Sequence, residues 1–215
     1  MRSTPVRLAL VAVTLVAVAG SACGGSGYQY VKNDDLGIYA RLPDDWTVFD
    51  EDDLFPDATE RELERQAQSL WVRVFDASDD PSIDAAENFD GPMPAGVVVA
   101  RALTVEQREA LDLAMLRGLG DPARNPLARA ETEPGYEVLL DEAVEYEGGF
   151  SGVHTVYVTA ETGSRVVVDQ TALRDSSSSA IVMFVVGCEE KCYAETHKDE
   201  IADLVDSWTI QEVRS

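Results

Sequence analysis

Five side chains of this sequence could carry out chemistry near neutral pH, namely three cysteines and two histidines. The cysteines are Cys23, Cys188 and Cys192, and the histidines are His154 and His197. A thiol can be acylated, oxidised to a disulfide or bound to a metal. An imidazole can act as a general base or as a metal ligand. The surroundings of these five residues therefore limit the reactions in which the protein could take part.

Cys23 follows a segment organised like an export signal. Arg2 and Arg7 precede an apolar run at residues 8–19, and three small residues fill positions 20–22. At a helical rise of about 1.5 Å per residue, the run would span about 18 Å, which is too short for a hydrocarbon core of about 30 Å. A positive start, a short apolar stretch and a small-residue cleavage site predict a secretory signal rather than a permanent membrane helix.

A cysteine directly after such a site resembles the lipobox of bacterial lipoproteins, in which the thiol receives a diacylglycerol and becomes the mature N-terminus. This predicts a signal peptide at residues 1–22, a lipidated Cys23 with a flexible tether at 23–27, and a folded domain at 28–215. The protein would then be lipid-anchored on the extracytoplasmic face of the cell membrane. Ala17-Val18-Ala19 also suits an ordinary secretory signal, so soluble secretion stays open as an alternative.

The charge of the chain is strongly acidic. Loss of residues 1–22 would remove two arginines and no acidic residue, which changes the formal net charge from −23 to −25. Such a surface repels nucleic-acid phosphates and anionic lipid headgroups. We therefore expect no nucleic-acid partner, and a domain that stands off the membrane on its tether. The acidic clusters lack EF-hand spacing, and we predict no metal and no other cofactor.

Lipidation of Cys23 would leave Cys188 and Cys192 as a pair in an oxidising compartment. Their spacing excludes both a redox Cys-x-x-Cys motif and Cys-x-x-Cys-His haem attachment. We predict a disulfide that fixes one local turn and that stabilises the fold by about 2 kcal/mol in the chain-entropy account. His197 lies five residues after Cys192, so a Cys/Cys/His metal site is the alternative, although no fourth ligand is evident.

The two histidines provide the only route to an enzymatic interpretation. His154 falls in a predicted strand and His197 in a charged predicted helix. Ser151 and Ser164 lie near His154 in sequence, but the chain has neither a G-x-S-x-G elbow nor a phosphate-binding glycine motif. We expect His154 to be a polar strand residue that faces solvent, and we predict no catalytic residue.

Strand signals dominate residues 28–213. Apolar or β-branched runs bounded by turn residues predict strands at 28–32, 37–42, 46–49, 70–75, 97–103, 136–146, 153–160, 165–173, 180–186 and 208–213. Short connections rich in Gly or Ser join the later runs and imply antiparallel pairing.

Helix signals are fewer. A capping box at Thr104 and Gln107 opens an apolar face that continues to Gly118 or Gly120. Residues 195–206 predict a second helix and residues 58–68 a weaker one. Residues 119–135 contain three prolines and two glycines, so we expect a long surface connection there. The predicted fold class is α+β, an antiparallel sheet with flanking helices.

Two segments resemble the ends of PsbP-like domains. Leu36-Gly37-Ile38 with Leu42-Pro43-Asp44-Asp45-Trp46 is similar to the opening of that family, and the Cys-x₃-Cys turn, helix and Asp206–Ile210 are similar to its end. Among these proteins, the LpqN-like actinobacterial lipoproteins match best in kind. The resemblance covers residues 28–213 and implies an α/β/α sandwich. It implies no shared catalytic residues, because the members are mostly accessory or binding proteins.

Together, these observations predict a non-catalytic, lipid-anchored binding or accessory module of the cell envelope, with an envelope protein or a lipidic ligand as its partner. Trp46 and Trp208 are expected to pack side by side in the core. The alternative is an extracytoplasmic hydrolase or metal-dependent enzyme that uses His154 or His197. A deep pocket lined by His154 and carboxylates would favour the enzyme, whereas an apolar groove would favour binding.

Overall fold

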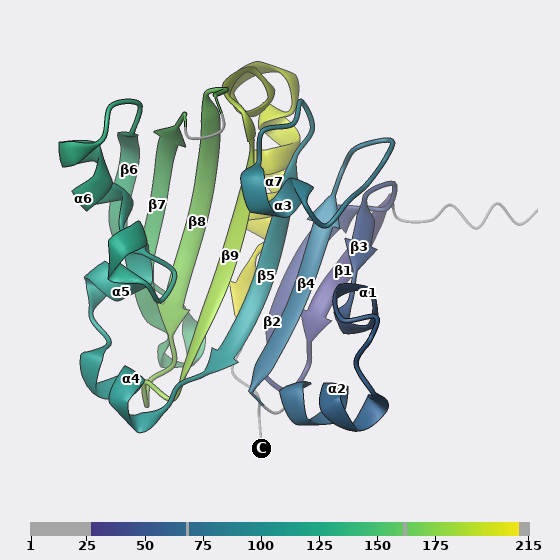
Figure 1. Cartoon of the computed structure of the whole chain (residues 1–215), viewed down its shortest axis with the longest axis vertical. Coiled ribbons are helices and arrows are strands. Elements are labelled where there is room, and N and C mark those ends of the chain that lie inside the picture. The colour runs from purple at the N-terminus through teal and green to yellow at the C-terminus, as the bar shows by residue number, and fades with distance from the viewer. Residues whose placement is uncertain (1–26, 68, 161–162, 211–215) are drawn as a thin grey trace, which may run out of the picture.

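The computed structural model describes residues 27–67, 69–160 and 163–210. These residues form a seven-stranded sheet and a three-stranded sheet, each with antiparallel pairing throughout, together with flanking helices (Figure 1). The α+β fold class predicted from the sequence is confirmed. Cys23 and the predicted signal segment lie outside the described residues, so the anchor stays a prediction.

The large sheet has the strand order β3-β4-β5-β9-β8-β7-β6. Its strands, in chain order, are β3 (Thr47–Phe49), β4 (Leu70–Asp76), β5 (Ala95–Ala102), β6 (Glu137–Glu145), β7 (Ser151–Thr159), β8 (Val166–Arg174) and β9 (Ala180–Glu189). The small sheet has the order β1-β2-β10, with β1 (Tyr28–Asn33), β2 (Ile38–Pro43) and β10 (Thr209–Ile210).

The helices are short, apart from the last. They are α1 (Glu51–Leu54), α2 (Glu60–Ala67), α3 (Ala85–Asn88), α4 (Val105–Ala110), α5 (Leu113–Arg117), α6 (Pro126–Thr132) and α7 (Lys198–Ser207). Two 3₁₀ turns, η1 (Pro122–Arg124) and η2 (Glu147–Gly149), and a π-helix, η3 (Cys192–Thr196), complete the elements. Among the described residues, no helix is long and apolar enough to cross a membrane.

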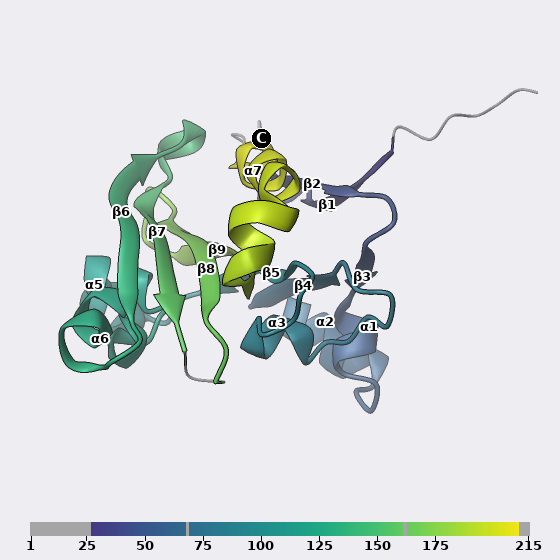
Figure 2. The same cartoon turned by 90° about the horizontal axis from the view of Figure 1, so that it is seen from above.

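The two faces of the large sheet are covered differently. The helix α7 and the small sheet lie over one face, here called the α7 side, and α3, α5 and α6 lie over the opposite face, here called the α5 side (Figure 2). Successive strand residues point to opposite faces. The central strands β8 and β9 are covered on both sides, so eight consecutive residues of each are buried.

The core of the α7 side contains a row of four stacked aromatic rings. Trp46, Phe75, Phe184 and Trp208 follow one another, with ring-centroid distances of 5.9, 6.2 and 5.2 Å along the row. Both tryptophans are buried, as predicted. The prediction that they pack side by side is wrong, because Phe75 and Phe184 lie between them. The row links the small sheet, α7 and the large sheet into one core.

Two helical predictions need correction. The capping box at Thr104 and Gln107 is present, but the predicted single helix is divided into α4 and α5. The break occurs because Leu111 is extended and the Asp112 side chain accepts a hydrogen bond from the Met115 amide, which starts a new helix. The predicted surface connection contains α6, because Asn125 caps a helix whose first residue is Pro126.

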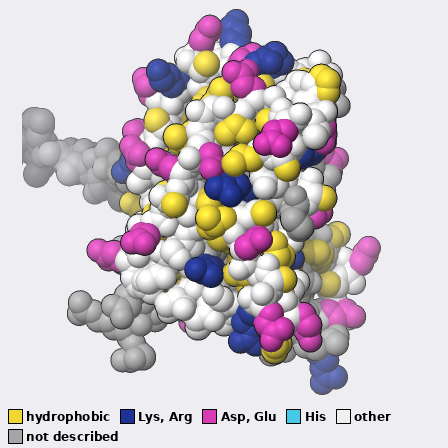
Figure 3. All heavy atoms as spheres, turned by 90° about the vertical axis from the view of Figure 1, so that its left-hand side faces the viewer, with side chains coloured by type: hydrophobic (Ala, Val, Ile, Leu, Met, Phe, Trp, Pro, Cys, Tyr) yellow, Lys and Arg dark blue, Asp and Glu magenta, His cyan; other side chains and the backbone are white. Residues whose placement is uncertain are grey.

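The outer edge of the large sheet is β6. Hydrophobic side chains gather on this side of the molecule and are interspersed with charged ones (Figure 3). Leu139 is 53% exposed and lies at a break in the pairing register with β7. Acidic residues recur along the same strand, at Glu137, Asp141, Glu142 and Glu145. A bulge and charges of one sign discourage another strand from pairing with this edge.

Candidate functional site

His154 lies on the α7 side of the sheet, within a group of polar side chains that bind one another. Its Nε2 is 2.8 Å from Oδ1 of Asp169, and its Nδ1 is 3.5 Å from a carboxylate oxygen of Glu142. The Tyr193 hydroxyl donates to the other oxygen of Asp169 over 2.7 Å. The Asp169 side chain is 5% exposed. We call His154, Asp169, Glu142 and Tyr193 the histidine cluster.

The ionisation of this cluster follows from its geometry. The hydrogen bond to Asp169 raises the pKa of His154, and Glu142 adds to the effect, against a smaller opposing effect of burial. Burial and the nearby Asp169 carboxylate raise the pKa of Tyr193, so this residue stays a neutral donor. Protonated His154 would therefore sit between two carboxylates, in an arrangement that favours its charged form.

The expectation that His154 faces solvent is wrong. Its side chain is 17% exposed, because Asp169 of β8 and Glu142 of β6 lie beside it, and the sequence could not show that these partners meet it. The two serines considered as nucleophiles do not join it. Ser151 pairs in register with Arg174 on β8, and within the described residues no hydrogen bond connects His154 to Ser151 or Ser164.

His197 has separate partners. It lies between η3 and α7, and its Nδ1 is 2.7 Å from Oε2 of Glu200. Cys188 and Cys192 are joined in a disulfide, as predicted, so their sulfurs do not ligate a metal together with His197. In the part of the chain that the structure describes, no three His, Cys, Asp or Glu side chains are arranged to hold a metal ion.

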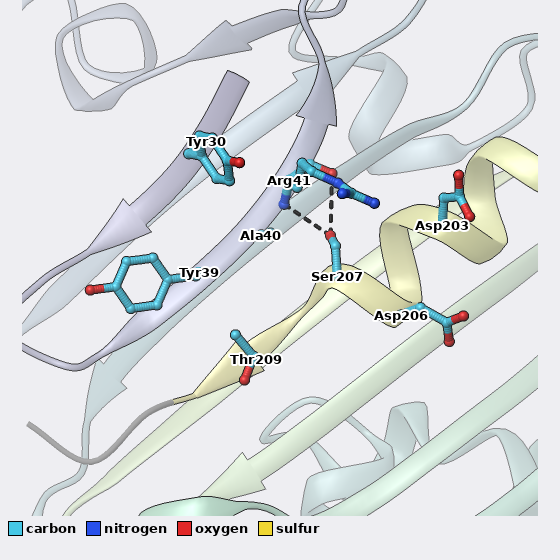
Figure 4. Close-up of a pocket in the computed structure, with 8 residues that line it drawn as sticks. All are labelled: Tyr30, Tyr39, Ala40, Arg41, Asp203, Asp206, Ser207 and Thr209. Carbon is cyan, nitrogen blue, oxygen red and sulfur yellow. Dashed lines mark hydrogen bonds between the residues drawn. The ribbon is translucent and has the colours of Figure 1, made fainter. Parts of the chain in front are cut away.

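A hollow of about 450 Å³ lies between α7 and the small sheet (Figure 4). Ser207 joins its two walls, because its hydroxyl accepts a hydrogen bond from the Arg41 amide and lies 3.2 Å from the Arg41 carbonyl. Asp203 and Asp206 of α7 also border it. The polar bonds across this hollow hold α7 to β2, which is a structural role.

A larger cavity, of about 750 Å³, lies on the α5 side between α3 and the α5–α6 segment; we call it the arginine pocket. Its floor is the sheet, where Val97 of β5 pairs in register with Val185 of β9, and Val168 of β8 lies nearby. Three aromatic residues also line it, namely Phe89, Tyr136 and Tyr157. The rings of Tyr136 and Tyr157 are stacked, with centroids 6.0 Å apart.

Three arginines line this pocket, namely Arg117, Arg124 and Arg129. Arg117 forms two bonds of 2.8 Å with Asp141, and Arg129 forms bonds of 2.9 and 2.6 Å with Glu133 and lies over the ring of Tyr136. Arg124 is 76% exposed. Among the described side chains no acidic residue lines the pocket, in a chain with 40 Asp and Glu.

The sheet holds Arg117 in place from behind. Asp141 of β6, which binds its guanidinium, also accepts a hydrogen bond from the Thr155 hydroxyl of β7 over 3.1 Å. Gln170 of β8 donates its amide to the Arg117 carbonyl. The bond to Asp141 raises the pKa of Arg117. A bidentate pair occupies two of the five N–H donors of an arginine, which leaves three for a ligand.

Sequence reasoning missed the arginine pocket. Its arginines fall in or beside the segment that was predicted to be a surface connection, and its floor belongs to strands that are distant in sequence. One signal was available: Arg117, Arg124 and Arg129 recur at short intervals in an otherwise acidic chain.

Solved structures that are similar to this chain include the PsbP and LpqN proteins, the two groups that the sequence motifs resemble. Cyanobacterial PsbP from Synechocystis has 12% identity and a TM-score of 0.48, over 88% of this chain and 95% of its own. LpqN of Mycobacterium tuberculosis, described as involved in cell envelope biogenesis, has 14% identity and a TM-score of 0.45, over 86% and 91%. The Ran-binding protein Mog1p of Saccharomyces cerevisiae has 10% identity and a TM-score of 0.44, over 85% and 95%.

No protein-family model and no curated protein sequence matches the chain. At the identities and TM-scores of the solved structures, the likeness assigns no ligand, partner or activity. The function must therefore be argued from the side chains themselves.

Proposed function

We propose that this chain is a lipid-anchored, non-catalytic binding or accessory module on the extracytoplasmic face of the cell membrane. The anchor rests on Cys23 and its preceding signal segment, and the observation that carries the non-catalytic role is the position of His154. In a hydrolytic triad one imidazole nitrogen binds a carboxylate and the other faces the nucleophile. Here Nε2 binds Asp169 and Nδ1 faces Glu142, so carboxylates flank both nitrogens.

The enzymatic alternative required a pocket around His154 and a nucleophile or a ligand set. The arginine pocket is the larger of the two cavities described above; it lies on the opposite side of the sheet and is lined by arginines, aromatic rings and valines. A cavity with an apolar floor and a few polar groups is typical of a binding site. This geometry supports a binding role for the pocket and a structural role for His154.

The anchor is tested by substitution of Cys23. We expect wild-type protein to incorporate label from radioactive palmitate and to sediment with membranes. The Cys23→Ser variant should lose the label and appear in the medium or as unprocessed precursor. The double variant Cys188→Ser/Cys192→Ser is the matched control, because it removes the other two thiols and should keep the label. Mature-sized Cys23→Ser protein in the membrane fraction would show that the lipoprotein interpretation is wrong.

The absence of catalysis is tested with His154→Gln/His197→Gln in cells that lack the wild-type chain. We expect this double variant to reverse any defect that the deletion produces, provided that circular dichroism shows a native spectrum. Failure to reverse the defect, with an intact fold, would make a histidine-centred active site the better explanation. Crosslinking in intact cells, followed by identification of the captured molecules, would then show the partner in either case.

A further inference from the structure

The arginine pocket has two chemically distinct ends. Toward α3 it is apolar, with Phe89 and the valine pair Val97 and Val185. Toward α5 and α6 it is cationic, with Arg117 and Arg129. One row of the sheet shows the same gradient, because Val97, Val185, Gln170, Thr155 and Asp141 pair in sequence across β5, β9, β8, β7 and β6. Of this row, Val97, Val185 and Gln170 line the pocket, so its floor changes from apolar at β5 and β9 to polar at β8.

The arginines are oriented by carboxylates that do not themselves line the pocket. Asp141 and Glu133 each form two bonds with a guanidinium, yet neither is among the lining residues. Arg117, whose carboxylate partner lies outside the cavity, presents its remaining donors in a fixed direction, which suits a carboxylate or a phosphate. The stacked rings of Tyr136 and Tyr157 add a flat surface beside these donors.

The size of the pocket fits a small molecule. Its volume of about 750 Å³ lies in the range of about 300–1,000 Å³ that is usual for ligand sites. The net charge of the chain disfavours anions at long range, so an anion bound here must be held by local contacts and by burial of an apolar body. An inorganic anion offers only the first of these, and a neutral apolar molecule offers only the second.

We propose that the arginine pocket binds an anionic amphiphile, with a carboxylate or phosphate head at Arg117, Arg124 and Arg129 and an apolar body over Val97, Val185 and Phe89. This inference names a ligand class for the proposed binding role. It does not depend on the lipid anchor, which is tested separately through Cys23.

The test is titration calorimetry of the purified full-length chain with probes kept below their micelle concentration. The probes are dodecanoate and dodecyl phosphate, the neutral 1-lauroylglycerol, and the bare heads acetate and inorganic phosphate. We expect at least one anionic probe to bind ten times or more tightly than 1-lauroylglycerol, and the bare heads to give no measurable heat. The better of the two anionic probes shows whether the head is a carboxylate or a phosphate.

Three variants locate the site. Arg124→Gln/Arg129→Gln should weaken binding of the anionic probe about tenfold, because it removes two of the three guanidinium groups. Val97→Phe keeps the charges and fills the apolar end, so it should weaken binding at least as much. Arg174→Gln, an exposed arginine at the far end of β8, is the matched control and should bind like wild type. Circular dichroism checks the fold of each variant.

Three results would overturn the proposal. Equal affinity for dodecanoate and 1-lauroylglycerol would mean that the arginines do not bind the charged head of the ligand. Binding of the bare heads as tightly as the amphiphiles would mean an anion site without an apolar part. Unchanged affinity in the double arginine variant, or no binding of any probe, would remove the pocket as a ligand site. In each case the Cys23 and histidine experiments would still decide the anchor and the absence of catalysis.

Discussion

Neighbouring residues of β7 and β8 serve opposite sides of the same sheet, and the two sides use their polar groups differently. His154 and Asp169 face the α7 side, where they bind each other and where Asp169 also accepts a hydrogen bond from Tyr193. Thr155 and Gln170, the next residues along each strand, face the α5 side, where they support Asp141 and Arg117. One side ends in a cluster of protein groups that bind one another, and the other ends in an arginine beside a cavity.

One pair of strands thus supports a polar cluster on one side and borders a cavity on the other. On the α7 side His154 and Tyr193 both bind the Asp169 carboxylate, so these groups of the histidine cluster are occupied by one another. On the α5 side the sheet binds the back of Arg117 and leaves donors of its guanidinium for another molecule. Substitutions that exploit this difference should separate stability from binding.

The largest contrast is expected between two aspartates. Asp169→Ala should lower the free energy of unfolding by about 3–4 kcal/mol, because it removes a buried carboxylate that is the shared acceptor of the half-buried His154 and Tyr193. Asp141→Ala should cost about 1–2 kcal/mol, because both partners of its ion pair with Arg117 are partly exposed and water can replace the lost bonds. Urea unfolding at pH 6 measures both values.

Asp169→Asn is the control for size in this pair. It keeps one acceptor oxygen and nearly the same volume, so its cost should lie between those of the two alanine variants. Equal costs for Asp169→Ala and Asp141→Ala would mean that the α7 side is no more closed to water than the α5 side.

A second contrast uses two adjacent valines of β9. Val186 is fully buried in the α7-side core, and Val185 is 2% exposed and lines the arginine pocket. Val186→Ala should cost about 2–3 kcal/mol, the transfer of two methyl groups plus a closed cavity. Val185→Ala should cost about 1–1.5 kcal/mol, because the space it leaves joins an existing cavity. Thermal and urea unfolding of the two variants, compared at equal pH, check the order.

A reversed order of these two costs would contradict the assignment of the cavity to the α5 side. Only Val185→Ala should change the affinity for a dodecyl probe, because Val186 has no contact with the pocket. The two variants therefore serve as controls for each other in both measurements.

The third effect concerns the disulfide, which ties η3 and Tyr193 to the end of β9. Cys188→Ala/Cys192→Ala should lower the free energy of unfolding by about 2 kcal/mol, in keeping with the short loop that the bond closes. Reduced wild-type protein should show the same loss, and a reductant should leave the double variant unchanged. A stability unaffected by reduction would mean that hydrogen bonding of Tyr193 to Asp169 is sufficient to hold this turn.

The sequence predicted the strands well because their patterns are local. The runs that became β7, β8 and β9 combine β-branched residues with Gly or Ser turns, and each was placed within a few residues of its observed bounds. The disulfide was also predictable from spacing and compartment. The division of the helix after Thr104 was not, because it depends on one capping bond from Asp112.

The two polar clusters could not be predicted from the sequence, because they depend on register and on long-range packing. His154 pairs directly with Thr171 on β8, and its bond to Asp169 runs diagonally between the two strands. Tyr193 belongs to the π-helix η3, which follows the last strand of the large sheet. The arginine pocket likewise joins α3, α5, α6 and four strands. Periodicity shows that alternate residues share a face, but it does not show which distant side chains meet there.

The smallest effect is a pH dependence of stability centred on His154. The pKa of this group is raised in the folded chain above its ordinary value, through Asp169 first and Glu142 second. Its contribution to stability is therefore complete below the pKa of the unfolded chain, about 6.5, and is lost as pH rises through the folded-state pKa. His154→Gln should thus destabilise the protein more at pH 5.5 than at pH 9. We expect the difference to stay below about 1 kcal/mol, because solvent still reaches the cluster.

Proton NMR of the His154 ring gives the decisive measurement for the closed side. The titration midpoint should lie above 6.5 in the wild-type chain, fall most in Asp169→Asn and fall less in Glu142→Gln, since Glu142 is 55% exposed and 3.5 Å from Nδ1. Tyr146 and Tyr193 also adjoin these carboxylates, and burial raises the pKa of both, so they remain neutral across this range. A midpoint at or below 6.5, or a greater stability loss at pH 9 than at pH 5.5, would mean that His154 is not held as a cation. The α7 side would then be open to water at this point, and the contrast between the two sides would disappear.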